Sequence, residues 1–541
     1  MSEGPSSPEL VGDDWCCEAL LELARPEIYC ENPFRLLEVP IDASSRDISR
    51  RSRRQQIMEK YGGGGRQGTA SGLSLQLSAE EDQVQAAQQR LRDPERRLID
   101  ELFWIWPEEP GKSKRDQAIM ALGRGDLNEA GRLWREREEA GDSDGVATHN
   151  LAVIYHVLAL DWELRALEAS ITAEQRKRQH AYWKQALPRW QELEKKEFFW
   201  SRLADRVREL NDPRLTTGTA RRIRTSLPVA LLLINAQLGL RAARAGDRNW
   251  AREHAKLIWN SGWGQEAIDE ALSRALRPLR DRVKSLCQQA RTNSDADPAG
   301  GDAVVQELIH GTRQPLRIMD YMLPRGNPMR QAAHDEVANA ALEVQVKFGR
   351  ETEDWQRSEE LLKSAAAVAE GQATRERLED NLNTVRENAR YKRLVERCFF
   401  CTRAADDGAE LEVQMYGNIT RTPTLEGTHV EWQKAVISVP RCNRCKKAHG
   451  KAVGLPCGLG CAGAIAALII AGIVSSVTGD SDAAAAAWLV GTFVLGVGGA
   501  VMGWAMGQAQ RGVKPIEHRD KYPPIRELIS KGWQFGEGPS G

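Results

Sequence analysis

Four cysteines in the last third of the chain have the types and spacing of a metal site. They form two CxxC pairs, Cys398-Phe-Phe-Cys401 and Cys442-Asn-Arg-Cys445, about forty residues apart. Each pair can make a tight turn with two thiolates on one side, and two such turns complete the tetrahedral S4 site typical of structural zinc. Because four cysteine ligands leave no open position for a catalytic water, the pattern predicts a structural Zn2+.

The segment between the two pairs is rich in β-forming residues, at 410–416 and at 429–439, with turns that contain Thr and Gly. These stretches predict the strands of a zinc ribbon over residues 396–450. The long gap between the pairs implies an extended hairpin. His449 is a spare candidate ligand that we expect at the surface.

A redox-active CxxC is the alternative chemistry for either pair. That chemistry needs one thiol of lowered pKa at a helix N-terminus, whereas the pattern predicts that both pairs border strands or loops. The presence of two pairs at this spacing therefore favours zinc.

The sequence lacks the motifs of common catalytic sites. It has no G-x-x-x-x-G-K-[ST], no G-x-G-x-x-G after a predicted strand, no H-E-x-x-H and no G-x-S-x-G. The glycine run at 62–65 lacks the Lys and the strand of a phosphate loop. His334-Asp335-Glu336 lacks the second His of a zinc protease. We therefore expect that the protein is not an enzyme.

Two apolar segments follow the cysteines, from about Pro456 to Val477 and from about Ala483 to Gly507. Each is near the roughly 20 residues that a helix needs to cross a bilayer core. The loop between them is acidic, whereas both outer flanks are basic. The basic flanking residues are Arg441, Arg444, Lys446, Lys447 and Lys451 before the first segment and Arg511 and Lys514 after the second.

Basic residues near membrane ends stay on the cytoplasmic side. The sequence therefore predicts a transmembrane hairpin of two helices at 456–507, with both termini and the tail at 508–541 in the cytoplasm. We expect a multi-pass protein of the plasma or inner membrane.

The second apolar segment carries a glycine at every fourth position, at Gly499, Gly503 and Gly507. This spacing gives a smooth face that another helix can approach closely. That helix is either the first one of the same hairpin or belongs to a second copy, so homo-oligomers through the transmembrane helices are an open alternative. Neither segment contains Asp, Glu, His, Lys or Arg, which argues against ion conduction.

The composition limits the classes of partner and compartment. At 541 residues the chain is long enough for three or four domains. Its 75 Lys and Arg residues nearly balance its 76 Asp and Glu residues, so no overall field favours nucleic acid. The N-terminus lacks the basic and apolar regions of a secretory signal peptide. In a chain that faces the cytoplasm, cysteines are expected as thiols or metal ligands.

Helical patterning dominates residues 113–395, whereas residues 1–31 form an acidic leader. Three stretches, at 118–134, 149–190 and 233–255, resemble the helix–turn–helix pattern of tetratricopeptide repeats without a clean 34-residue period. The resemblance implies an α-solenoid with a concave protein-binding surface, and a helical spacer is the alternative. His149 and His156 share one helix face, where we expect core or groove side chains.

Residues 32–107 form a compact helical unit with recognisable ends. The run Asn32-Pro33-Phe34-Arg35-Leu36-Leu37-Glu38-Val39-Pro40 precedes a basic helix, and a later helix contains Leu91-Arg92-Asp93-Pro94-Glu95-Arg96. This order resembles the J domain of Hsp40 co-chaperones. The resemblance implies Hsp70 as a partner. The candidate partner-binding residues on the basic helix are Arg50, Arg51, Arg54 and Lys60.

The resemblance fails at the motif with which J domains stimulate Hsp70. In that family His-Pro-Asp follows the basic helix, whereas here Lys60-Tyr61 is followed by the glycines at 62–65, and His-Pro-Asp occurs nowhere. The glycines give a flexible loop without the rigid Pro and the acidic Asp. We favour a J-like docking or packing unit, with an active co-chaperone as the alternative.

Taken together, these patterns predict a mostly α protein with a J-like module, an α-solenoid, a small β zinc ribbon and two transmembrane helices. The expected function is a membrane-anchored scaffold or adaptor that binds protein partners on the cytosolic side. An Hsp70 co-chaperone acting at the membrane is the alternative.

Overall fold

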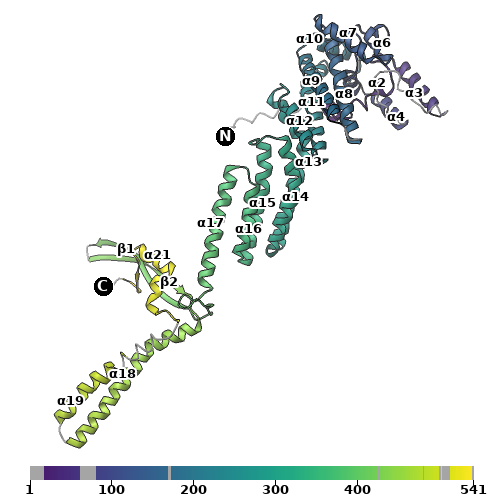
Figure 1. The fold of residues 1–541 in the computed structure, drawn as a ribbon. Coiled ribbons are helices and arrows are strands. Elements are labelled where there is room, and N and C mark those ends of the chain that lie inside the picture. Colours follow the sequence, from purple (N-terminus) through teal and green to yellow (C-terminus); the bar gives the residue numbers. More distant parts are fainter. Residues whose placement is uncertain are drawn as a thin grey trace. The chain divides into compact units, whose positions relative to one another are not determined.

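The computed structural model describes residues 17–60, 81–168, 172–424, 427–478, 481–498, 501 and 512–538. The chain divides into two compact units. The first, the helical body, contains the residues up to 347 and 364–376, and the second contains 348–363 and 377 onward. Figure 1 shows helices throughout the first unit and helices with a small sheet in the second, which confirms the prediction of a mostly α protein.

The helices of the helical body range from 4 residues in α2 to 32 residues in α13. They are α1 (Glu18–Leu23), α2 (Pro33–Leu36), α3 (Ser45–Lys60), α4 (Glu81–Arg90), α5 (Pro94–Leu102), α6 (Gln117–Gly123), α7 (Leu127–Glu139), α8 (Val146–Glu168), α9 (Ala173–Glu194), α10 (Glu197–Leu210), α11 (Thr219–Arg244), α12 (Arg248–Trp259), α13 (Gln265–Ala296) and α14 (Gly301–Met322). Helices α15 (Pro328–Thr352), α16 (Trp355–Val368) and α17 (Gln372–Val395) contribute to both units.

Aromatic side chains fill the core of the helical body. Trp183 and Trp190 of α9 are fully buried, and the ring of Trp190 lies 5.5 Å from that of Phe103. His149 and His156 of α8 are buried among these rings, which confirms the prediction that they are core side chains. Large rings of this kind bury much apolar area each and dominate core energetics.

One carboxylate is buried in this core. Glu163 of α8 accepts hydrogen bonds from the indole N–H groups of Trp183, at 3.1 Å, and Trp250, at 2.9 Å. Its Oε1 also lies 3.1 Å from Nε2 of His254, which is itself fully buried. A buried charge is tolerated only when it is paired and hydrogen-bonded in this way. The network therefore ties α8, α9 and α12 into one arrangement.

The segment that resembles a J domain contains α2 to α5, and its Asp93-Pro94 dipeptide begins α5. Asp93 caps α5 by accepting from the backbone N–H groups of Glu95 and Arg96, and Pro94 occupies the first helical position, where no N–H is needed. Arg90 of α4 pairs with the buried Asp100 of α5. Residues 61–80, with the glycine run, lie outside the described residues.

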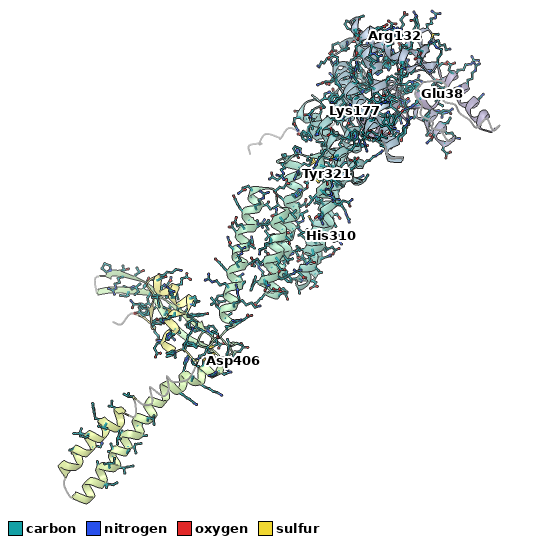
Figure 2. All side chains as sticks on the ribbon, viewed as in Figure 1. Glu38, Arg132, Lys177, His310, Tyr321 and Asp406 are labelled. Atoms are coloured by element: carbon teal, nitrogen blue, oxygen red, sulfur yellow. The ribbon has the colours of Figure 1, made fainter. Side chains whose placement is uncertain are left out.

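This segment is packed into the helical body. Arg35 of α2 forms a buried ion pair with Asp161 of α8 at 3.2 Å, and the backbone N–H of Trp106 donates to Oδ1 of Asn150, also on α8, at 2.8 Å. On α3, Arg51 pairs with Glu38, which is labelled in Figure 2. Contacts of this kind, made far along the chain, mean that the segment shares the core of the body.

Among the described residues, one helix is long and apolar enough to cross a membrane. It is α11, with a mean hydropathy of 1.4, and 78% of its apolar stretch is buried inside the helical body. The two predicted membrane segments contain shorter apolar stretches, Cys461–Ala471 and Trp488–Val497. The prediction of two transmembrane helices is therefore not confirmed.

A three-stranded antiparallel sheet forms the β part of the second unit. β1 (Leu411–Thr424) pairs with β2 (Gly427–Val439) from Leu411 opposite Val439 to Thr424 opposite Gly427. The short β3 (Gln534–Phe535) pairs with β1 at Met415 and Tyr416, so the strand order is β2-β1-β3. The predicted strands at 410–416 and 429–439 are confirmed, and β3 joins them from the C-terminal tail.

The chain then forms a long antiparallel helical hairpin. α18 (Asn443–Thr478) packs against α19 (Ser481–Gly491) and against the π-helical turn η3 (Thr492–Val497) that continues it. A Cβ on Gly463 would lie 2.1 Å from the carbonyl oxygen of Leu495, so this close approach requires glycine. Large apolar side chains along both helices of this hairpin are exposed.

Candidate metal centre

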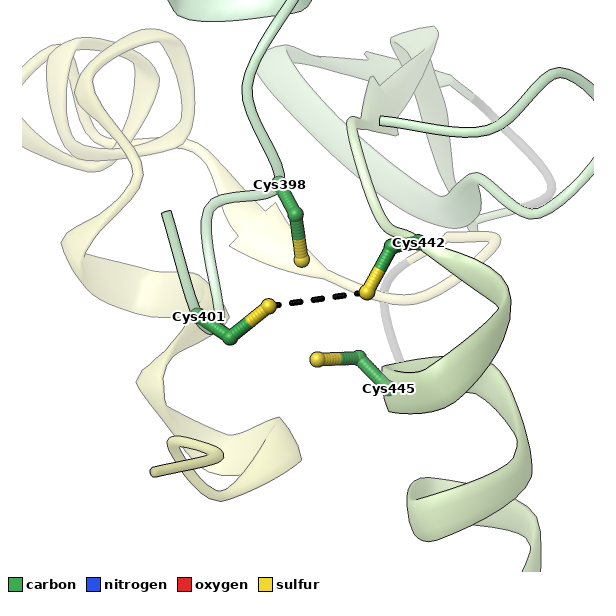
Figure 3. A group of neighbouring side chains, drawn as sticks. All are labelled: Cys398, Cys401, Cys442 and Cys445. Atoms are coloured by element: carbon green, nitrogen blue, oxygen red, sulfur yellow. Dashed lines mark hydrogen bonds between the residues drawn. The ribbon is translucent and has the colours of Figure 1, made fainter. Parts of the chain in front are cut away.

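The thiols of Cys398, Cys401, Cys442 and Cys445 converge on one point (Figure 3). All four sulfurs lie within 4.8 Å of one another, and Sγ of Cys401 is 3.5 Å from Sγ of Cys442. A tetrahedral zinc ion with Zn–S bonds of about 2.3 Å holds its sulfurs about 3.8 Å apart. The four side chains therefore fit a metal such as zinc, as the spacing predicts.

The first pair sits in a turn that the backbone closes upon itself. The N–H of Cys398 donates to the carbonyl of Arg403 at 2.7 Å, and the N–H of Thr402 donates to the carbonyl of Cys398 at 2.8 Å. Thr402 adopts φ +64°, a left-handed conformation that L residues rarely take. The N–H of Phe399 donates to Pro440 at 2.9 Å, which ties this turn to the approach of the second pair.

The second pair begins α18, so the prediction that both pairs border strands or loops is wrong for this one. The N–H of Asn443, the first residue of α18, donates to the carboxylate of Asp406 at 2.7 Å. Arg441, just before Cys442, donates through Nε to the carbonyl of Ala409 at 2.8 Å. Two residues of the linking segment thus hold the start of the helix in place.

Proton sharing distinguishes the four thiols. Burial opposes ionisation of Cys442, but hydrogen bonds from the Cys445 N–H and from the thiols of Cys401 and Cys445 lower its pKa to about 7. Burial and hydrogen bonds from the same cluster raise the pKa of Cys445 and of Cys401. Four clustered thiols cannot all ionise without a cation, so metal binding at neutral pH has to release protons.

A lowered pKa at a helix N-terminus is also the signature of a redox-active cysteine. A dithiol couple, however, needs two sulfurs, whereas here four lie together and the second CxxC is packed against the first. The geometry therefore favours the metal over the redox alternative.

The tail that follows the hairpin completes this site, which the sequence did not reveal. Tyr522 and Ile525 of the tail are buried in one apolar cluster with Cys398, Cys442 and Cys445. The cluster also contains Phe400, Val413, Met415 and Val439. Together with β3, these contacts make a single cysteine module from residues 398–451 and 512–538. The only signal in the sequence was a short apolar pattern near residue 525.

His449 also belongs to the module, so its expected surface position is wrong. It is 5% exposed, and its ring packs against Phe400 with the centroids 4.5 Å apart. Its Nε2 lies 2.9 Å from the carbonyl of Lys514, and burial lowers the pKa of the imidazole. His449 thus joins the start of α18 to the returning tail, and the described geometry gives the four thiols as the ligand set.

A second cluster of potential ligands lies in the helical body. Asp320, His334 and Glu370 offer atoms within 4.8 Å of one another. Arg330 donates to Glu370 through Nε at 2.9 Å and lies 3.1 Å from Asp320. Because Arg330 pairs with both carboxylates and His334 lies 2.9 Å from Asp320, we interpret the cluster as an ion-pair network that joins α14, α15 and the loop before α17.

The remaining predicted residues do not meet in one site. Arg50 is exposed on α3, whereas Arg51 is half buried and donates to the carbonyl of Leu37 at 3.1 Å. The side chains of Arg54 and Lys60 lie outside the described part, as do Gly499, Gly503 and Gly507.

The close helix contact that the structure does describe uses Gly463 and Gly491 instead. A Cβ on Gly491 would lie 3.0 Å from Cβ of Ala467.

The chain matches no protein-family model, no curated protein and no solved structure, so neither the J-domain nor the tetratricopeptide resemblance gains support from a match.

Proposed function

We propose that this protein is a membrane-anchored adaptor. In this proposal the α18–α19 hairpin lies in the bilayer, the cysteine module holds a structural zinc ion at the cytosolic surface, and the helical body binds protein partners in the cytosol.

The observation that carries the membrane anchor is the exposed apolar surface of the hairpin. Large apolar side chains point away from the helix contact along both helices. Exposure of each of these side chains to water would cost free energy. They are at least 39% exposed and comprise Ile465, Leu468, Ile469, Ile470 and Ile473 on α18 and Trp488, Leu489, Val490, Phe493, Val494, Leu495, Val497 and Val501 on the return. A lipid environment satisfies such a surface, and the helical backbone satisfies its own hydrogen bonds there.

The cysteine module supports the topology of this anchor. It is built from chain on both sides of the hairpin, because His449 contacts Lys514 and β3 pairs with β1. A module folded from both flanks requires that they lie on the same side of the membrane. The number of crossings is then even, in agreement with the basic flanks.

An internal replacement tests the anchor without disturbing the module. Since residues 449 and 514 are in contact, a short Gly/Ser linker can replace 452–511. We expect the full chain to stay in the membrane pellet after alkaline carbonate extraction and the linker variant to be soluble with its zinc retained. A linker variant that still sediments with membranes would refute the proposal.

The adaptor role rests on the extent of the helical body. A pull-down with the full chain from detergent-solubilised membranes tests it. We expect a protein partner that is retained after washing with ATP. Recovery of the chain alone under conditions that preserve its fold would contradict the adaptor role.

The second candidate is an Hsp70 co-chaperone, favoured by the order of α2 to α5 and by the exposed Arg50. It predicts that the full chain accelerates ATP hydrolysis by an Hsp70 from the same cell and that Arg50→Ala abolishes the acceleration. Arg325→Ala, at a solvent-exposed turn of the same body, is the matched control. A rate that equals that of Hsp70 alone would eliminate this candidate.

A further inference from the structure

The first turns of α18 form a junction between the cysteine module and the apolar hairpin. The helix is continuous from Asn443 to Thr478 (Figure 1). It begins at the second cysteine pair and enters the apolar segment near residue 456. Lys451 precedes that residue by five positions, or about 7.5 Å of helix. Any side chain on this junction is therefore held close to the surface of the bilayer that we propose for the hairpin.

The two faces of this junction differ. Cys445, Ala448 and His449 are buried and face the module. Lys447 and Lys451 are exposed, four positions apart, which places them one above the other on the helix. Because the module occupies the first face, the lysines point to its outside.

The charge of the junction is of one sign. Residues 441–478 contain five Lys and Arg residues and no Asp or Glu. Besides Lys447 and Lys451, two of these five have partners within the module: Arg441 donates to the carbonyl of Ala409 at 2.8 Å, and Lys446 donates to the carbonyl of Gly408 at 2.6 Å. No ion pair within the described residues involves Lys447 or Lys451. Their charge is therefore unlike that of the helical body, where exposed bases are interleaved with acids, as in the Arg132 pairs with Glu129 and Glu136.

We propose that Lys447 and Lys451 bind the headgroups of anionic phospholipids. The inference rests on the proposed membrane anchor and adds lipid selectivity to it. A lysine ammonium at the membrane surface attracts the phosphate and carboxylate groups of lipids such as phosphatidylserine, by an interaction that salt screens. The rigid helix fixes the lysines at headgroup depth, and the cysteine module fixes the side of the helix on which they lie.

Spin-label electron paramagnetic resonance tests this selectivity. The full chain is reconstituted in phosphatidylcholine bilayers with a trace of spin-labelled phosphatidylserine or spin-labelled phosphatidylcholine. The fraction of motionally restricted lipid is then compared for the two labels. We expect phosphatidylserine to be favoured at least roughly twofold. The preference should vanish in Lys447→Gln/Lys451→Gln and in about 0.5 M KCl.

The matched control removes two positive charges from the helical body instead of from the junction. Lys177→Gln/Lys184→Gln removes two exposed lysines from α9, of which Lys177 is labelled in Figure 2, and should keep the preference. Equal association of both labels with the natural chain would overturn the lipid inference and leave the anchor intact. No restricted lipid with either label would overturn the anchor and this inference together.

Discussion

The helical body and the cysteine module reach an ordered structure by different means. The body buries whole aromatic side chains, such as Trp134, Trp183 and Trp190, in a core that many helices share. The module has a small core in which three of the nine fully buried members are cysteines. A core of that size supplies little stability by itself, and small natural domains often add a structural metal or disulfides. Packing therefore sustains the body, whereas we expect the module to depend on a bound metal and on its own C-terminal tail.

Removal of one thiol should give the largest difference between the two regions. In Cys442→Ser the site loses a ligand, and structural zinc contributes roughly 10–16 kcal/mol in small zinc modules. We expect zinc to be lost and amide hydrogen exchange to become fast in β1 and β2, while protection in α8 and α9 is unchanged. Zinc content by mass spectrometry and exchange on the same sample measure both.

Cys461→Ser is the control for that loss, because Cys461 is exposed on α18 outside the cluster. It should retain the full zinc content. Zinc retention in Cys442→Ser would contradict the metal site, and loss of protection in α8 would contradict the independence of the body.

The tail should matter to the module almost as much as a ligand. Tyr522 is 2% exposed, packs its ring 5.3 Å from that of Phe399, and has its pKa raised to about 12 by burial. Tyr522→Ala removes a buried aromatic ring, for which about 3–5 kcal/mol is typical. We expect faster zinc release to a chelator. Tyr391→Ala, at a residue 60% exposed on α17, should release zinc at the natural rate; equal rates in both variants would refute the role of the tail.

Acid should weaken the two regions by different routes. Burial lowers the pKa of His149 to about 4 and that of His156 to about 3. Below about pH 6.5 these two histidines bind protons in the unfolded chain but stay neutral in the folded body. Their contribution to the free energy of unfolding therefore falls as the pH falls. From pH 7.5 to 5.5 the two histidines together should cost about 2.7 kcal/mol.

Denaturant titrations over that pH range, followed by tryptophan fluorescence, measure the slope. His156→Gln should remove about half of the histidine contribution to that slope. A zinc ion held by the four thiolates should be lost at low pH because protons compete for the sulfurs, and added zinc should restore the module alone. Burial also raises the pKa of Asp100 to about 7, so its protonation opposes the histidine slope over the same range. The test is therefore the difference between the natural chain and His156→Gln, and equal slopes in the two would contradict the burial of a neutral His156.

The sequence predicted the parts whose chemistry is local. CxxC spacing identified all four thiols, and the enrichment in β-forming residues located β2 and the first half of β1. The single helix expected through Leu91–Arg96 is instead broken, because Asp93 caps α5 and Pro94 takes its first position. These features depend on residues a few positions apart, for which capping, turn and periodicity rules apply.

What it did not predict depends on contacts between distant segments. Tyr522 lies more than a hundred residues from Cys398, and a two-residue strand such as β3 carries no periodic signal. His449 reads as one polar residue in a basic run, yet the return of Lys514 buries it. Similarly, the cluster of Asp320, His334 and Glu370 forms only where α14 and α15 meet the loop before α17. Periodicity identifies an element, but packing decides which of its polar residues become buried.

The smallest predicted effect compares one device that both regions use. Asp93 caps α5 in the body, and Asp406 (Figure 2) accepts from the first N–H of α18 in the module. Loss of a helix cap costs about 1 kcal/mol. In Asp93→Ala we expect that cost in the unfolding of the body, with zinc affinity unchanged. In Asp406→Ala the same cost should appear as a roughly fivefold weaker zinc affinity, because the cap positions the helix that carries Cys445. Competition with a chromogenic chelator measures the affinity, and a fivefold loss in Asp93→Ala instead would show that the module draws its stability from the body.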